Sequence, residues 1–156
     1  MRLTEILSPD SVKVPLTATT KQEAIFELVD QLVQVMGLEK SRDELRNNVW
    51  QREQTRSTGI GHNVAIPHGK CKVLSRLAMA VGKTAAPMEF GSIDGKPVEI
   101  IFLLASPMDQ NGPHIQALAS ISRMLTDPVM RNSIRAAQSA EELYEVITQY
   151  EAKVAT

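Results

Sequence analysis

The segment 98–105 is the most apolar part of the chain, and it contains the longest purely apolar stretch, residues 100–105. Near-continuous hydrophobicity over this length predicts a strand buried on both faces at the centre of a sheet. The segments 77–81 and 11–16 also show strand patterns, and Pro15 favours an edge position for the second of them. Because the apolar stretch is far shorter than the roughly 20 residues of a membrane helix, we do not expect membrane insertion.

Amphipathic helices are predicted on both sides of these strands along the sequence. Three have a capping-box start signal, a Ser or Thr followed three residues later by Glu: Thr20 with Glu23, Ser41 with Glu44, and Ser139 with Glu142. Gly37 is placed to end the first helix, Pro113 to open another at its first turn, and a further segment runs over 127–137. The side chains predicted to face the core are Ala24, Ile25, Leu28, Val29, Leu32, Val33 and Met36, then Leu45, Val49 and Trp50, then Ile115, Leu118, Ile121 and Leu125, and finally Leu143, Val146, Ile147 and Tyr150. Central strands with helices at both ends predict one α/β or α+β domain over 1–156.

The charge balance argues against nucleic acid as a partner. Seventeen Lys and Arg against 18 Asp and Glu give a formal net charge of −1, and aromatic residues make up only 4%. Neither a basic surface nor a row of base-stacking rings is therefore indicated. The N-terminus lacks the apolar run and cleavage site of a signal peptide, so we expect a cytoplasmic protein.

Metal and thiol chemistry are not expected either. The chain has a single cysteine, Cys71, which excludes an internal disulfide. We interpret it as a packing residue, the commoner role of a lone cysteine. The three histidines, His62, His68 and His114, lack the spacing of a helical zinc motif, so neither a metal nor another cofactor is expected.

Reactive polar residues concentrate between Arg52 and Lys70. The run Ser-Thr-Gly-Ile-Gly at 57–61 lacks the glycine pattern of a dinucleotide site, but successive backbone N–H groups in such a turn can bind an anion. Ser57 and Thr58 add hydroxyl donors, and the planar guanidinium of Arg52 suits phosphate oxygens. The set fits a small phosphoryl group better than a nucleotide.

Two histidines are candidates for the reacting group. His68 stands between Pro67 and Gly69, and His114 follows Pro113. Histidine acts near neutral pH because its free pKa is about 6.5. Considered alone, each histidine is better explained as a loop residue that makes one hydrogen bond. Only their combination with Arg52 favours a phosphoryl-transfer site.

Several of these motifs are similar to those of a known protein family. Arg52-Glu53, the run 57–61, and Ala-Ile-Pro-His-Gly-Lys at 65–70 resemble the phosphorylation-site signature of enzyme IIA domains of the bacterial phosphoenolpyruvate-dependent phosphotransferase system, fructose–mannitol class. The similarity extends over nearly the whole chain, including the 113–114 and 135–144 segments, and is greatest to the nitrogen-regulatory branch. It implies one phosphocarrier domain with a mixed β-sheet flanked by helices on both sides.

The resemblance also implies roles for individual residues. His68 corresponds to the phosphorylated nucleophile, and Arg52 and His114 to its site partners. The implied phosphate-binding residues are Ser57, Thr58, Gly59, Ile60 and Gly61. The implied phosphoryl donor is HPr or its nitrogen-branch counterpart, which we expect to dock on an apolar face around the site that includes Ile60 and Ile66.

The sequence leaves three functions open. The first is a regulatory phosphoprotein whose phosphorylation state selects its protein targets. The second is a sugar-transport component that passes the phosphoryl group to a separate enzyme IIB, and the third is an interaction module that is never modified. The combination of Arg52, His68 and His114 disfavours the third. The first is preferred because no permease segment is fused to the domain.

Overall fold

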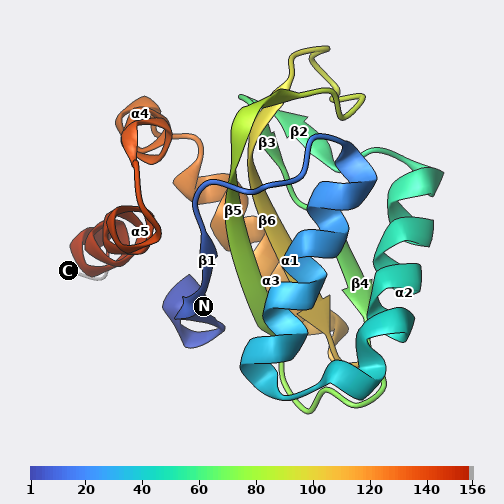
Figure 1. Cartoon of the computed structure of the whole chain (residues 1–156). Coiled ribbons are helices and arrows are strands. Elements are labelled where there is room, and N and C mark those ends of the chain that lie inside the picture. Colours follow the sequence, from blue (N-terminus) through green and yellow to red (C-terminus); the bar gives the residue numbers. More distant parts are fainter. Residues whose placement is uncertain (155–156) are drawn as a thin grey trace.

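The computed structural model describes residues 1–154 and shows a six-stranded mixed sheet with helices on both faces (Figure 1). The strands are β1 Leu7–Lys13, β2 Gly59–Gly61, β3 Val64–Ala65, β4 His68–Lys70, β5 Ala78–Met88 and β6 Val98–Ser106. The helices are α1 Lys21–Met36, α2 Arg42–Thr55, α3 Asn111–Met124, α4 Pro128–Ala136 and α5 Ala140–Val154, with the 3-10 turns η1 Leu3–Glu5 and η2 Glu39–Ser41. The strand order is β1-β5-β6-β3-β2, and β4 also pairs with β6.

Two apolar layers hold the helices against the sheet. On one face, Leu28 of α1 and Val49 of α2 belong to the same buried cluster as Ile101 and Leu103 of β6. On the other face, α3, α4 and α5 contribute to a second cluster with strand residues (Figure 1). The arrangement confirms the expected α/β class and the mixed sheet with helices on both sides. Within residues 1–154, no helix has both the length and the hydropathy that crossing a bilayer requires.

Strand β6 lies inside the sheet, antiparallel to β5 and parallel to β3 and β4. Its side chains alternate between the two layers: Ile101 and Leu103 join the α1–α2 cluster, whereas Ile100 and Phe102 join the α3–α5 cluster. Burial on both faces leaves no solvent-facing position for a polar residue, which explains the apolar run. The predicted central strand is confirmed. β1 is an edge strand as predicted, although it covers Leu7–Lys13 rather than 11–16.

The segment around the histidine motif contains strands that the sequence did not indicate. β2 and β3 form a short antiparallel hairpin whose turn residues, His62 and Asn63, have φ values of 55° and 66°. β3 and β4 then follow β6 in succession, with Val64 opposite Ile100 and His68 opposite Leu104. Each is only two or three residues long, too short for hydrophobic alternation to be recognised.

The predicted helix starts have different outcomes. Thr20 accepts a hydrogen bond from the Glu23 N–H, and Ser139 accepts one from Glu142 N–H, so those two caps are confirmed. Ser41 makes no side-chain cap, because the turn η2 leads directly into α2. The Glu44 carboxylate instead accepts a hydrogen bond from the Lys72 N–H.

One predicted core residue is wrong. Ile115, in the first turns of α3, is 64% exposed, whereas Ile121 and Met124 further along the helix are fully buried. The helix begins at Asn111, two residues before Pro113, and its first turns lie beyond the buried cluster that covers its C-terminal half. The periodicity identified the helix but not the length of it that the sheet covers.

Candidate functional site

The fold brings Arg52, His68 and His114 together from three different elements. Arg52 lies in the last turn of α2, His68 begins β4, and His114 lies in the first turn of α3. The imidazole rings of the two histidines are edge to face, with centroids 5.0 Å apart. His62, on the exposed turn of the β2–β3 hairpin, is not part of this group.

His68 is held in one tautomer by its own loop. Its Nδ1 lies 2.9 Å from the backbone oxygen of Ile66, and since a carbonyl only accepts, Nδ1 carries the hydrogen and Nε2 presents a lone pair. Burial lowers the pKa of His68 from 6.5, and the Arg52 charge lowers it further, against opposing effects of the Ile66 hydrogen bond and of Glu53. The ring is therefore neutral at neutral pH and has a nucleophilic nitrogen.

His114 is also kept neutral. Burial lowers its pKa, and repulsion from His68 when that ring is protonated and from Lys70 lowers it further, to about 4. Its Nδ1 lies 2.5 Å from the hydroxyl oxygen of Ser106, the last residue of β6. Because both rings are neutral, neither has to lose a proton before an anionic group binds next to them.

Close packing of α2 on β4 determines where Arg52 lies. A Cβ atom added at Gly69 would come 2.7 Å from Val49 Cγ2 and 2.8 Å from the Val49 backbone nitrogen. Only glycine permits this approach, and it brings the end of α2 beside the motif histidine. The Arg52 guanidinium donates from Nη1 to the backbone oxygen of Arg56, which fixes the side chain at the helix end.

The Ser57–Gly61 segment is anchored by a buried carboxylate. Glu53, whose side chain is 0% exposed, accepts hydrogen bonds from the Thr58 N–H at 2.9 Å and from the Thr58 hydroxyl at 2.5 Å. Lys21 at the start of α1 pairs with the same carboxylate at 2.9 Å. The Ser57 hydroxyl donates to the Phe90 backbone oxygen and accepts from the Gly59 N–H. Several donors predicted to bind phosphate are thus engaged within the protein.

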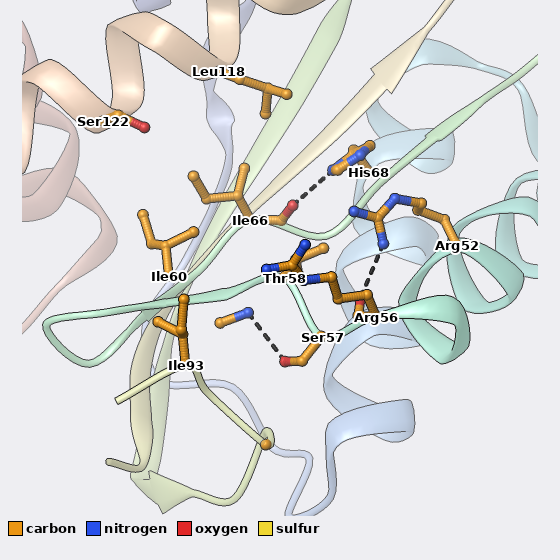
Figure 2. A pocket seen from close by; sticks show the side chains of 12 residues that line it. Arg52, Arg56, Ser57, Thr58, Ile60, Ile66, His68, Ile93, Leu118 and Ser122 are labelled. Carbon is orange, nitrogen blue, oxygen red and sulfur yellow. Dashed lines mark hydrogen bonds between the residues drawn. The ribbon is translucent and has the colours of Figure 1, made fainter. Parts of the chain in front are cut away.

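Two hollows meet at Arg52 and His68. The first, of about 450 Å³, has isoleucine side chains on one side and the arginines Arg52 and Arg56 on the other (Figure 2). Its other lining residues are Ser57, Thr58, Gly59, Ile60, Ile66, Gly91, Ile93, Leu118 and Ser122. The second, of about 530 Å³, is lined by Asn48, Gln51, Thr55, Gly69, Lys70, Met108 and His114 besides the two shared residues. Gly61, which was predicted to bind phosphate, lines neither.

Three residues that support the site were not expected from the sequence. Glu53 lies in the polar segment between Arg52 and Lys70, but the sequence assigned it no role in holding the loop, and nothing indicated that Lys21 or Ser106 would contact site residues. A charged residue next to Arg52 in a helical pattern is usually solvated, and a serine at the end of an apolar strand is usually a turn residue. Within residues 1–154, no group of three or more His, Cys, Asp or Glu side chains is arranged to hold a metal, and Cys71 is buried.

Comparisons with known proteins identify the family. A model of the "Phosphoenolpyruvate-dependent sugar phosphotransferase system, EIIA 2" family matches residues 5–150. A nitrogen regulatory protein from Bradyrhizobium diazoefficiens is 31% identical over 147 residues, covering 94% of this chain and 95% of that protein. The crystal structure of nitrogen regulatory protein IIA-Ntr from Neisseria meningitidis superposes with a TM-score of 0.83 at 29% identity, covering 92% of this chain and 97% of that one.

A more distant structure shows the same fold. A chain in the complex of enzyme IIA mannitol with phosphorylated enzyme IIB mannitol from Escherichia coli superposes with a TM-score of 0.75 at 20% identity, covering 92% of this chain and 99% of that chain. Because the family model covers nearly the whole sequence, the identification does not depend on the motif alone. The chain belongs to the EIIA 2 family of the phosphoenolpyruvate-dependent sugar phosphotransferase system.

Proposed function

We propose that this protein is a phosphohistidine carrier that accepts a phosphoryl group on His68 from a phosphorylated HPr-like protein. The main support is geometric: the His68 ring donates its Nδ1–H to Ile66 O and lies beside His114 and Arg52. This arrangement leaves a nucleophilic Nε2 next to a fixed positive charge, as transfer of an anionic phosphoryl group requires.

The proposed reaction is an in-line displacement at phosphorus. The Nε2 lone pair of His68 forms a new N–P bond while the N–P bond of the donor histidine breaks, and its electron pair returns to the donor nitrogen. His68 becomes a positively charged phosphoimidazole, and the Ile66 carbonyl stabilises this charge through the Nδ1–H. The equatorial oxygens accumulate negative charge, which Arg52 and His114 offset.

The Ser57–Gly61 segment has a supporting role in this proposal. Since the N–H and hydroxyl of Thr58 are both donated to Glu53, they hold the loop in place rather than binding the phosphoryl group. The segment then supplies the wall of the first hollow, with Ile60 at its rim (Figure 2). Phosphate binding falls mainly to Arg52 and His114.

We propose that the phosphorylation state regulates other proteins. Support comes from the whole-length similarity to nitrogen regulatory proteins. The second candidate, transfer to a separate enzyme IIB during sugar uptake, is favoured by the fold shared with an enzyme IIA solved in complex with phosphorylated enzyme IIB. Acceptance of the phosphoryl group by an enzyme IIB, followed by sugar phosphorylation, would decide for transport.

Labelling with phosphoenolpyruvate, enzyme I and HPr tests the carrier function. We expect an acid-labile phosphoryl group on the intact protein and none on His68→Ala. The matched control is His62→Asn, which removes an exposed imidazole and tolerates the positive φ of that turn. Undiminished labelling of His68→Ala, or loss of labelling in His62→Asn alone, would overturn the assignment.

A further inference from the structure

The side chain of Ser106 is a buried hydroxyl at the end of an apolar strand. Ser106 is the last residue of β6, pairs in register with Lys70 of β4, and is 0% exposed. Its backbone oxygen accepts a hydrogen bond from the Cys71 N–H. Its hydroxyl, at the end of the apolar strand, lies 2.5 Å from Nδ1 of His114. A buried hydroxyl needs an acceptor for its single hydrogen, because leaving it unpaired costs stability.

The direction of this hydrogen bond follows from the available partners. Among the hydrogen bonds of residues 1–154, His114 Nδ1 is the one partner of the Ser106 hydroxyl. If Nδ1 carried a hydrogen, it would donate to the serine oxygen and the serine hydrogen would have no acceptor. If Nδ1 has a lone pair, the hydroxyl donates to it and both groups are satisfied.

We propose that Ser106 is a positioning residue that donates its hydroxyl hydrogen to Nδ1 of His114 and so keeps that histidine in the Nε2–H tautomer. The consequence for phosphoryl transfer rests on the proposed function: the Nε2–H is then the hydrogen-bond donor that the His114 ring presents in the second hollow. In the opposite tautomer, Nε2 would carry a lone pair and would repel a phosphoryl oxygen. His68 and His114 thus have opposite hydrogen placements, since His68 carries its hydrogen on Nδ1.

The tautomer can be measured without any phosphoryl transfer. Long-range proton–nitrogen NMR of the unphosphorylated protein at about pH 7, where His114 is neutral, reports which ring nitrogen carries the hydrogen. We expect a single Nε2–H tautomer, and in Ser106→Ala a displaced Nδ1 resonance because its hydrogen-bond donor is lost. A protonated Nδ1 in the intact protein, or an Nδ1 resonance unchanged in Ser106→Ala, would overturn the inference.

The kinetic consequence is measured in the same variants. Ser106→Ala should lower the maximal rate of phosphoryl transfer about fivefold, the effect of one hydrogen bond, while KM for the phosphorylated donor stays unchanged because Ser106 is fully buried. Ser106→Thr, which keeps the hydroxyl, should restore the Nδ1 resonance and most of the rate. An unchanged maximal rate in Ser106→Ala would contradict the positioning role.

A matched control removes another buried serine hydroxyl from the same region. Ser120 on α3 is 9% exposed and donates to the Met1 backbone oxygen, away from His114. Ser120→Ala should leave both the His114 spectrum and the transfer rate unchanged, and an equal effect in this variant would attribute the Ser106 result to general loosening. If the intact protein accepts no phosphoryl group, the carrier function fails, yet the NMR spectrum still decides the Ser106 inference.

Discussion

The two hollows that meet at Arg52 and His68 are similar in size but differ in the types of residue that line them. The first presents isoleucines, of which Ile93 is 76% exposed and Ile60 40% exposed, beside two arginines. The second is lined mainly by polar side chains, including Lys70 and His114. Exposed apolar side chains around a charged residue are typical of a protein-docking surface, whereas converging polar groups suit a small anion. For the proposed carrier, we expect the partner to contact the apolar rim of the first hollow and the phosphoryl oxygens to lie against the polar groups of the second.

The largest effect is expected where the two hollows share a residue. Arg52→Ala should slow phosphoryl transfer about 100-fold, the usual consequence of removing one charged donor from a transition state. The free energy of unfolding should change little, because the guanidinium makes its hydrogen bond to Arg56 O at the protein surface. Single-turnover transfer and denaturant unfolding measure the two quantities. A normal rate, or a large loss of stability, would contradict the shared role.

The second-largest effect is expected from the close packing of α2 on β4, which places Arg52 beside His68. Gly69→Ala would force α2 away from β4, because the new methyl group meets the backbone of Val49. We expect a loss of about 1–3 kcal/mol in the free energy of unfolding together with slower transfer. Gly112→Ala is the control, since a Cβ there meets nothing within 4 Å, and its stability should change by less than about 1 kcal/mol. Equal stabilities of the two variants would show that the close approach is unimportant.

A smaller effect, on KM rather than on the maximal rate, should distinguish the role of the first hollow from that of the second. Ile93→Ser removes an exposed apolar side chain from the first hollow, so KM for the phosphorylated donor should rise about five- to tenfold with little change in the maximal rate. Val73→Ser alters a 53% exposed valine that lines neither hollow and should leave KM unchanged. A fall in the maximal rate at constant KM would assign Ile93 to the chemistry instead of docking.

The pH dependence gives the smallest effect near neutrality. The folded-state pKa of His68 lies below 6.5 and that of His114 is about 4, so both rings are neutral at pH 7. Their contribution to stability is therefore present above about pH 6.5 and is lost as the pH falls from there through the folded-state values. Transfer should decline over the same range as His68 gains a proton. NMR titration that finds either midpoint above 6.5 would contradict the assigned environment.

The parts of this structure that the sequence predicted are those set by local chemistry. Thr20, Glu23 and Gly37 define both ends of α1, and the apolar run of β6 reports burial on both faces. β3 and β4 are stabilised by pairing with β6 rather than by their own sequence, so local patterns could not reveal them. The exposure of Ile115 likewise depends on how far the sheet extends beneath α3.

The candidate site also has some residues that the sequence predicted and others whose role depends on contacts in the folded chain. His68, Arg52 and His114 were recognised through motif residues, and the fold brings the three together. Glu53 and Ser106 act through contacts made only in the folded chain, so their residue types alone carried no signal. In the turn predicted to bind an anion, the Thr58 N–H is donated to Glu53 and the Gly59 N–H to Ser57, contacts that the sequence could not show.

In the proposed carrier, a neutral His68 holds the phosphoryl group on Nε2, the ring nitrogen that its loop leaves free. Phosphorus and nitrogen NMR of the protein phosphorylated by phosphoenolpyruvate, enzyme I and HPr tests this most directly. We expect the phosphorus to be coupled to Nε2 of His68, with Nδ1 still protonated and donated to Ile66 O. Phosphorus on Nδ1 of His68, or on any other residue, would rule out Nε2 of His68 as the phosphorylated atom.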